Sequence, residues 1–222
     1  MKSLKLDEHE KEVQYISQVY RNCGILLAKI LLKTKITPNT VTYTYIIVGL
    51  SAAILFAIAR NRTAVITAAI LAQLALILDR TDGSLARRKN ITSRIMNWID
   101  YNVDVLIDKA ILFALALGYF IKTGNYLFLI FGATTIMLKD LIYNMNTALF
   151  VSTENTREIY EKAKKGIISQ GIPTRALIYL SFLIFIIINQ VLVYFTFMTM
   201  YLSIFYIASM IYLTKRIKNA KE

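Results

Sequence analysis

Five aspartates interrupt otherwise apolar sequence between positions 79 and 108. They are Asp79, Asp82, Asp100, Asp104 and Asp108. An ionised carboxylate at membrane depth is costly unless another group neutralises it. If these side chains converge without an equal number of cations, bound metal must supply the balance. All-oxygen ligation selects Mg²⁺ or Mn²⁺ over zinc, and a pair of such ions activates both ends of a phosphoryl displacement.

The spacing of the aspartates places them on the faces of two consecutive helices. Asp79 and Asp82 are three residues apart and share a helical face, while the other three recur every four residues. Because consecutive membrane helices run antiparallel, the two acidic faces can meet. At about 1.5 Å per residue, Asp79 and Asp104 both fall in the cytoplasmic third of a hydrocarbon core roughly 30 Å thick. The sequence thus predicts one acidic site near the cytoplasmic membrane surface.

Two residues beside the first acidic pair suit a phosphate ligand. Gly83 follows Asp82 directly, where a side chain would obstruct the close approach of a ligand to the backbone. Arg87 lies about one helical turn further on, and its planar guanidinium can clamp a phosphate.

The composition predicts an all-α integral membrane protein that positions these residues. The 222 residues are 56% hydrophobic with a mean hydropathy of +0.51, which is too apolar for an ordinary soluble domain. Only eight Gly and two Pro favour long uninterrupted helices. The single Cys23 excludes an internal disulfide.

We expect two regions, an N-terminal juxtamembrane segment at 1–36 and a catalytic domain of six membrane-spanning helices at 37–222. Within the first region, residues 7–21 predict an amphipathic helix in the interface plane, and Gly24–Leu32 is apolar but too short to span. Thr37-Pro38-Asn39 predicts a helix start. The expected spans cover about 41–59, 64–87, 96–121, 126–150 and two further segments between Pro173 and Lys215, separated by a turn within Asn189–Thr199.

The basic residues predict the orientation in the membrane. Placing both termini in the cytoplasm puts 21 of the 26 Lys and Arg residues on that side and three on the other. The net charge of +12 then indicates attraction to anionic membrane lipids, as in the run Lys162–Lys165. Nucleic-acid binding is not expected, because the aromatic residues lie within spans rather than on a basic face.

A longer pattern carries a resemblance to a known family. Asp79-x2-Asp82-Gly83-x2-Ala86-Arg87-x8-Met96-x3-Asp100-x3-Asp104 resembles the signature of the CDP-alcohol phosphotransferases, also called CDP-alcohol phosphatidyltransferases: D-x2-D-G-x2-A-R-x8/9-G-x3-D-x3-D. Seven of the eight fixed positions match at the family's spacing, and Met96 stands where the family has Gly. The Thr37-Pro-Asn lead-in and the six expected spans extend the likeness over most of the chain.

The resemblance implies a transfer of substituted phosphate in phospholipid biosynthesis. A CDP-linked alcohol, CDP-diacylglycerol or CDP-archaeol, would bind with its pyrophosphate on two Mg²⁺ or Mn²⁺ ions. The acceptor hydroxyl would attack the phosphorus that bears the alcohol, and CMP would leave. If the family's Gly admits the nucleotide, the Met96 side chain must swing aside. The likeness also implies a homodimer.

The resemblance further implies roles for individual residues. Asp79, Asp82 and Asp100 would hold the metals, and Asp104, a metal ligand or close to one, would be the general base. The residues implied in CDP binding are Asp79, Asp82, Gly83, Ala86, Arg87 and Ser93.

Three basic residues are candidates for acceptor binding, namely Lys139, Arg157 and Arg175. They favour inositol phosphate or glycerol phosphate as the acceptor, although serine or an amino alcohol remains open. Lys139 could equally form a buried ion pair with Asp140 and contact no ligand. The positive-inside rule alone accounts for the two arginines. We expect Asp108 to pair with Lys109 or Lys139.

Two other functions fit part of the pattern. An intramembrane prenyltransferase also holds pyrophosphate with Asp and Mg²⁺, but it has no counterpart of Asp82-Gly83-x2-Ala86-Arg87. A non-enzymatic cation transporter would use the carboxylates as a transport site.

Overall fold

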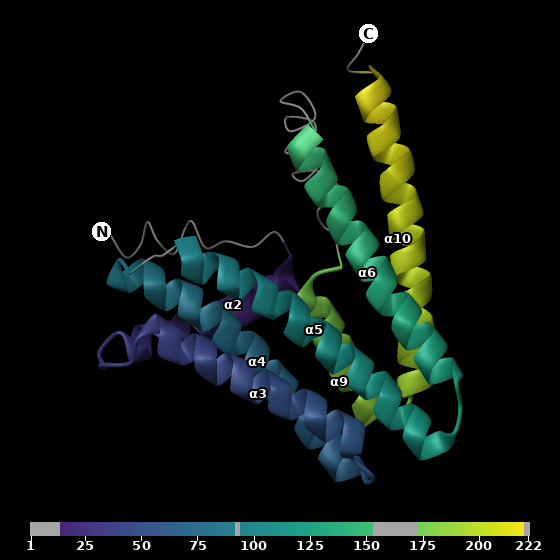
Figure 1. Cartoon of the computed structure of the whole chain (residues 1–222), viewed down its shortest axis with the longest axis horizontal. Coiled ribbons are helices and arrows are strands. Elements are labelled where there is room, and N and C mark those ends of the chain that lie inside the picture. The colour runs from purple at the N-terminus through teal and green to yellow at the C-terminus, as the bar shows by residue number, and fades with distance from the viewer. Residues whose placement is uncertain (1–13, 92–93, 153–172, 220–222) are drawn as a thin grey trace.

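The computed structural model describes residues 14–91, 94–152 and 173–219, and every regular element in these ranges is a helix (Figure 1). The helices are α2 (Tyr15–Leu31), α3 (Pro38–Ile58), α4 (Arg62–Lys89), α5 (Arg94–Thr123), α6 (Leu127–Ser152), α9 (Arg175–Ile187) and α10 (Val191–Asn219). The all-α prediction is confirmed for these residues.

Four helices are long and apolar enough to cross a membrane. They are α3, α4, the Leu127–Met145 part of α6 and the Val191–Lys215 part of α10. These lengths and compositions are typical of a multi-pass membrane protein. Six helices follow α2 in the described ranges, but α9 has only 13 residues and α5 carries several charges. Six membrane crossings therefore stay a prediction.

Local sequence explains where the helices begin and end. The Thr37 hydroxyl accepts the backbone N–H of Thr40, and Pro38 occupies the first turn, so the predicted start of α3 is confirmed. Asn61 caps α4 through the N–H of Ala64. Asn90 ends α4 in the left-handed conformation (φ 55°), which Asn tolerates better than most residues. As expected, α4 continues without a break through the acidic pair and Gly83.

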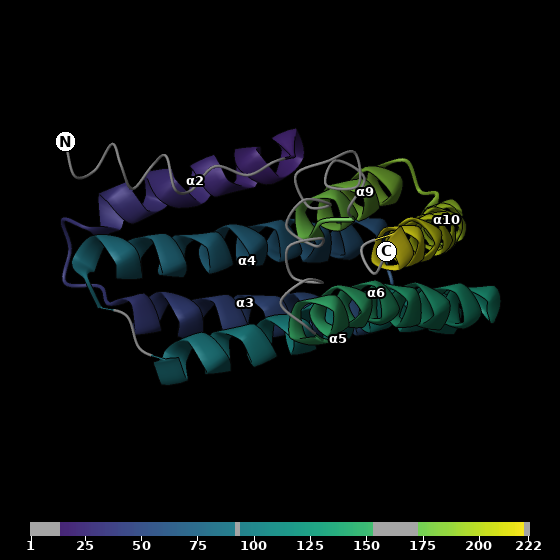
Figure 2. The same ribbon diagram turned by 90° about the horizontal axis from the view of Figure 1, so that it is seen from above.

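The N-terminal region differs from the prediction. Instead of two pieces at 7–21 and 24–32, one continuous helix, α2, covers Tyr15–Leu31, and residues 1–13 lie outside the described ranges. It packs on α4 and α9 (Figure 2). Gly24 permits the approach to α4, because a Cβ there would lie 2.7 Å from the Cβ of Arg80. The sequence placed Gly24 in a short apolar segment, whereas in the structure it allows α2 and α4 to pack closely.

The helices after α2 form two connected groups. Helices α3, α4 and α5 pack together, with α9 against α4. Helices α6 and α10 pack on each other and lean away from the first group in Figure 1. A large apolar core joins the groups and includes Tyr45, Phe56, Leu115, Phe182 and Tyr194.

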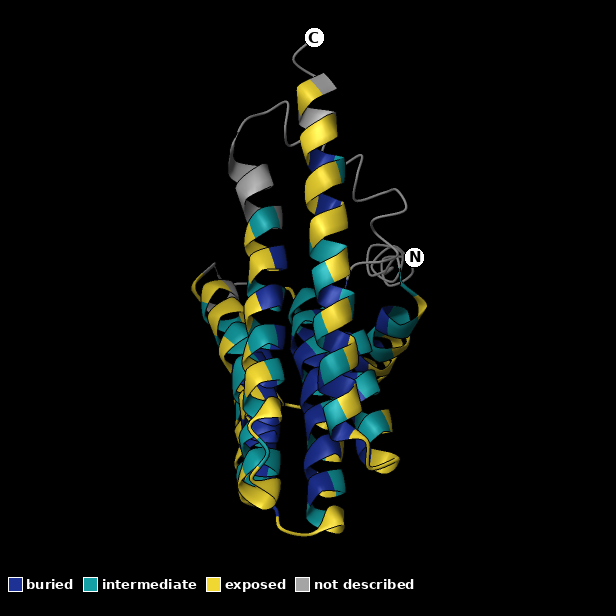
Figure 3. Cartoon of the chain, turned by 90° about the vertical axis from the view of Figure 1, so that its right-hand side faces the viewer, coloured by how far each residue is buried: buried dark blue, intermediate teal, exposed yellow. Residues whose placement is uncertain are grey.

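The outer faces of α6 and α10 are rich in exposed apolar residues (Figure 3). Ile130, Met137, Phe197 and Ile204 are each more than half exposed. Such faces suit contact with lipid chains. The turn between α9 and α10 falls at residues 188–190, at the very beginning of the predicted interval, and Asn189 adopts a φ of 59° there.

Candidate active site

Three of the predicted carboxylates converge between α4 and α5. One oxygen from each of Asp79, Asp82 and Asp100 lies within 4.8 Å of the others. Asp79 and Asp82 are buried and Asp100 is partly buried. The three-residue spacing puts the first two on one face of α4, and the contact between α3, α4 and α5 brings Asp100 against them. We call Asp79, Asp82 and Asp100 the carboxylate triad.

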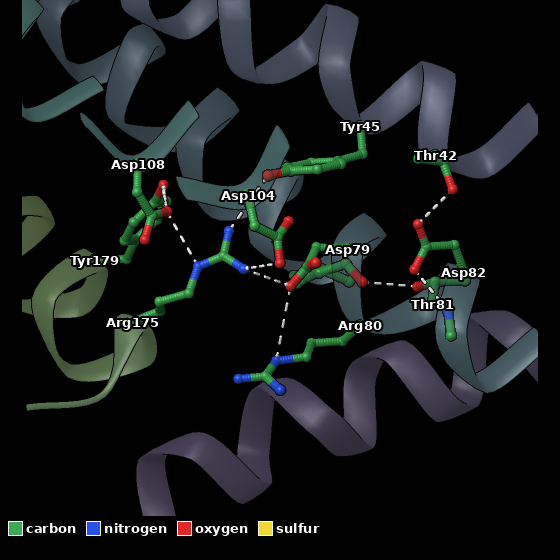
Figure 4. A network of polar contacts seen from close by, with 12 residues as sticks. Thr42, Tyr45, Asp79, Arg80, Thr81, Asp82, Asp104, Asp108, Arg175 and Tyr179 are labelled. Carbon is green, nitrogen blue, oxygen red and sulfur yellow. Dashed lines mark hydrogen bonds and ion pairs between the residues drawn. The ribbon is translucent and has the colours of Figure 1, made fainter. Parts of the chain in front are cut away.

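Residues on either side orient Asp82 within the triad. The Thr42 hydroxyl on α3 donates a 2.6 Å hydrogen bond to Asp82 Oδ2, and the backbone N–H of Gly83 lies 2.6 Å from Asp82 Oδ1 (Figure 4). A Cβ on Gly83 would lie 3.5 Å from Arg87 Nη1, so the guanidinium of Arg87 sits over the glycine. The predicted proximity of Gly83 and Arg87 is present in the structure. Ala86 lies on the same helix, partly buried.

Arg175 connects the triad to Asp104. Its Nη1 donates to Asp79 Oδ2 at 3.0 Å and to Asp104 Oδ2 at 2.8 Å. Figure 4 shows the guanidinium reaching from α9 between carboxylates of α4 and α5. Asp104 therefore lies beside the triad, with a basic side chain on one of its oxygens. Arg80 makes a longer ion pair with Asp79, at 3.9 Å.

Asp108 lies one helical turn after Asp104 and accepts hydrogen bonds from three side chains. Lys139 Nζ lies 2.5 Å from its Oδ2, while Arg175 Nε at 3.0 Å and the Tyr179 hydroxyl at 2.7 Å donate to its Oδ1. The expected pairing of Asp108 with Lys139 is confirmed. The alternative in which Lys139 pairs with Asp140 is wrong, because Asp140 pairs with Lys109 at 2.8 Å. Both lysines reach across the α5–α6 contact rather than along their own helix.

A pocket of about 480 Å³ opens beside Asp104, between α5, α6 and the start of α9. Its charged lining residues are Asp104, Asp108, Lys109, Lys139, Asp140 and Arg175. The volume is that of a small-molecule site. Two of the three predicted acceptor residues, Lys139 and Arg175, are thus brought to one cavity together with the predicted base.

The acidic site fits a hard divalent cation. Asp100 Oδ1 and Asp104 Oδ1 are buried and accept no hydrogen bond from the described residues. A buried carboxylate oxygen without a donor is unfavourable unless a cation approaches it. The donor set is entirely carboxylate oxygen, which suits Mg²⁺ or Mn²⁺.

Some predicted residues cannot be placed. Ser93 and Arg157 lie outside the described ranges. Met96 lies within α5, and its side chain is outside the described part of the structure.

Sequence reasoning missed three residues that support the site. Thr42 is separated from Asp82 by 40 positions, and no local pattern marks it. Tyr45, 3.4 Å from Arg175 Nη2, is equally remote in sequence. Tyr179 lies four residues after Arg175 and so shares its helical face, which is a signal that could have been used.

Comparison with known proteins agrees with this geometry. The family model for CDP-alcohol phosphatidyltransferases matches residues 35–211. No curated protein matches the chain in sequence. The fold is similar to the crystal structure of a Mycobacterium tuberculosis phosphatidylinositol phosphate synthase with CDP-DAG bound. The TM-score is 0.65 at 15% identity, over 86% of this chain and 92% of that one.

The family match includes the carboxylate triad, Asp104 and two of the pocket's basic residues, Lys139 and Arg175. It covers well over half of the 222 residues. The chain therefore belongs to the CDP-alcohol phosphatidyltransferase family and is a transferase of substituted phosphate groups.

Proposed function

We propose that this enzyme moves the lipid-bearing phosphate of a CDP-linked lipid alcohol to the hydroxyl of a polar acceptor and releases CMP. The observation that carries the proposal is the carboxylate triad lying beside Asp104 and an open pocket. Family membership decides against the prenyltransferase and the cation transporter, the two alternatives that the sequence left open.

The donor is a CDP-lipid, CDP-diacylglycerol or CDP-archaeol. The similar fold of the mycobacterial synthase, which was crystallised with CDP-DAG, supports a donor of this class. On this chain, Gly83, Ala86 and Arg87 form the side of α4 next to the triad, where the guanidinium of Arg87 lies over Gly83 and would bind a phosphate. Ser93 belongs to the same proposed contact surface.

Asp79, Asp82 and Asp100, with Asp104 adjoining, would hold two Mg²⁺ or Mn²⁺ ions. When bound, such ions neutralise the pyrophosphate and stabilise the charge that develops during phosphoryl transfer. Thr42 fixes the rotamer of Asp82 through its 2.6 Å hydrogen bond, so this ligand is ordered before the ion arrives.

Asp104 is the general base of the proposed reaction. It lines the pocket and has one oxygen without a hydrogen bond, and that oxygen takes the proton of the acceptor hydroxyl. The acceptor oxygen then forms a bond to the phosphorus that carries the lipid. The bond from that phosphorus to the CMP oxygen breaks, and CMP leaves with the electron pair.

The acceptor is a phosphorylated polyol, with inositol phosphate first and glycerol phosphate second. Lys139 and Arg175 in the pocket support an anionic acceptor, and Arg157 is a third proposed contact. Lys139 and Arg175 are each paired with carboxylates, so a phosphate would share them with Asp108 and Asp104. Serine or an amino alcohol is the alternative acceptor.

The active site faces the cytoplasm in this proposal, with both termini on the same side, and the enzyme is a homodimer in the membrane. The distribution of Lys and Arg supports the sidedness.

The test is product analysis with purified protein in lipid nanodiscs. CDP-diacylglycerol and CDP-archaeol are each offered with labelled inositol 1-phosphate, glycerol 3-phosphate and serine. We expect CMP release coupled to one labelled lipid product, lost on chelation and restored by Mg²⁺ or Mn²⁺. Release of pyrophosphate would overturn the proposal. So would a folded protein that releases no CMP with any pair of donor and acceptor.

A further inference from the structure

Asp108 is an anion that the family signature does not include, yet it is among the least exposed charged groups of the described residues. It is 4% exposed. Its two oxygens accept hydrogen bonds from side chains of two other helices. These are Lys139 on α6 and both Arg175 and Tyr179 on α9. The carboxylate therefore ties three helices together at one point beside the pocket.

The two cations on Asp108, Lys139 and Arg175, also line the pocket near Asp104. Arg175 uses its Nε on Asp108 and its Nη1 on Asp79 and Asp104. A guanidinium is planar and rigid, so fixing the Nε side also fixes the direction of the Nη1 side. Asp108 thus sets the position of Arg175 relative to Asp104.

Lys139 depends on the same anion. Its side chain is 21% exposed, its Nζ lies 2.5 Å from Asp108 Oδ2, and it lines the pocket. A lysine has a long flexible stem, and its ordering on ligand binding is costly unless a neighbour has already fixed the charge. Asp108 supplies that neighbour.

We propose that Asp108 is a positioning residue for the acceptor: it holds Lys139 and Arg175 in place to receive an anionic group next to Asp104. The inference rests on the proposed function. Asp108 touches neither the acceptor nor the reacting phosphorus and acts through the two cations. Its loss impairs acceptor binding more than donor binding. Both proposed acceptor cations contact Asp108, whereas among the described residues Asp108 reaches the triad only through Arg175.

A purely structural role for Asp108 would have a different signature. Buried ion pairs often contribute little net stability, and breaking one destabilises the fold through the charge left behind. In that case removing the anion would lower the thermal midpoint and the fraction of active enzyme, and both KM values would stay unchanged.

The test compares Asp108→Asn with Thr135→Val. The first keeps the shape of the side chain and removes its charge. The second removes the hydrogen bond between Thr135 on α6 and Thr199 on α10 and leaves the ion pairs of Asp108 in place. With CDP-diacylglycerol and inositol 1-phosphate, we expect D108N to raise the acceptor KM at least tenfold. The donor KM stays within twofold, and T135V changes neither KM by more than twofold.

Two further measurements keep the outcomes separate. If D108N does not fold, as judged by Mn²⁺ binding and thermal midpoint, Asp108→Glu takes its place. It keeps the charge but moves the carboxylate by one methylene, and should also raise the acceptor KM. A wild-type acceptor KM in the folded variant overturns the role of Asp108. A wild-type enzyme that releases no CMP overturns the proposed function instead.

Discussion

Asp104 has two kinds of neighbour, the acidic side chains of the carboxylate triad and the guanidinium of Arg175. One of its oxygens is held by Arg175 at 2.8 Å, and the other is buried without a hydrogen bond. This asymmetry suits a base, because one oxygen is fixed and the other is available to a proton. The spacing of the signature identified Asp104, but its partner Arg175 lies 71 positions away. That pairing depends on how α9 docks, which no local pattern encodes.

Asp104→Asn should separate binding from chemistry. The amide keeps the volume of the side chain but cannot take a proton, so we expect kcat to fall by about 10²- to 10⁴-fold. CMP binding, measured by calorimetry in the presence of Mn²⁺, should be retained. Unchanged CMP release from this variant would remove Asp104 from the mechanism.

Thr42→Val should weaken metal binding without touching a metal ligand. The substitution removes the 2.6 Å hydrogen bond that orients Asp82, and loss of such an outer partner typically costs about 10- to 100-fold in metal affinity. Thr44→Val is the matched control, because the Thr44 hydroxyl bonds only to the Thr40 carbonyl on an exposed face. Mn²⁺ titration followed by electron paramagnetic resonance measures both. Equal affinities in the two variants would contradict the role of Thr42.

At the scale of helices, α4 and α5 position the acidic groups and α2 braces α4 from outside. Composition and apolar spacing predicted α3, α4 and α5 to within a few positions, and Thr37-Pro38-Asn39 is a local signal for the start of α3. The packing of α2 was not predictable in the same way. It depends on Gly24 meeting Arg80, a contact across 56 positions that only the docked helices reveal.

Gly24→Ala should destabilise the protein although alanine is the better helix former. The added Cβ would lie 2.7 Å from Arg80 Cβ and 3.0 Å from the Arg80 carbonyl carbon, so α2 must shift away from the Asp79 segment. We expect a loss of about 1–3 kcal/mol, typical of overpacking, seen as a lower thermal midpoint in detergent. Gly83→Ala is the stability control, because its Cβ would meet the end of the flexible Arg87 side chain, 3.5 Å from Nη1 and 4.0 Å from Nη2. An equal or higher midpoint for Gly24→Ala would contradict the close contact.

At the scale of the whole molecule, the acidic site lies towards one end of the α3–α5 group. At this end α3 begins, α4 ends and α5 begins (Figure 1). Composition was sufficient to predict a helical membrane protein, and the Lys and Arg distribution predicts which end faces the cytoplasm. The lean of α6 and α10 away from this group was not predictable, because their polar contacts, such as Lys139 with Asp108 and Thr135 with Thr199, join residues far apart in sequence.

Cysteine labelling tests the orientation. The native Cys23 is replaced by Ser, and single cysteines are placed at the exposed Lys35, before α3, and at the exposed Thr123, the last residue of α5. A membrane-impermeant maleimide should label Thr123→Cys in intact cells and Lys35→Cys only in inverted vesicles. The reverse pattern would contradict a cytoplasmic site.

The most direct test of the account asks whether the carboxylate triad holds a divalent ion. Crystals of the protein grown with Mn²⁺ and CMP are measured near the manganese absorption edge. We predict an anomalous difference peak bounded by Asp79, Asp82 and Asp100, which is absent from crystals of Asp82→Asn. Well-ordered triad side chains with no anomalous peak between them would contradict the proposed metal-dependent phosphoryl transfer.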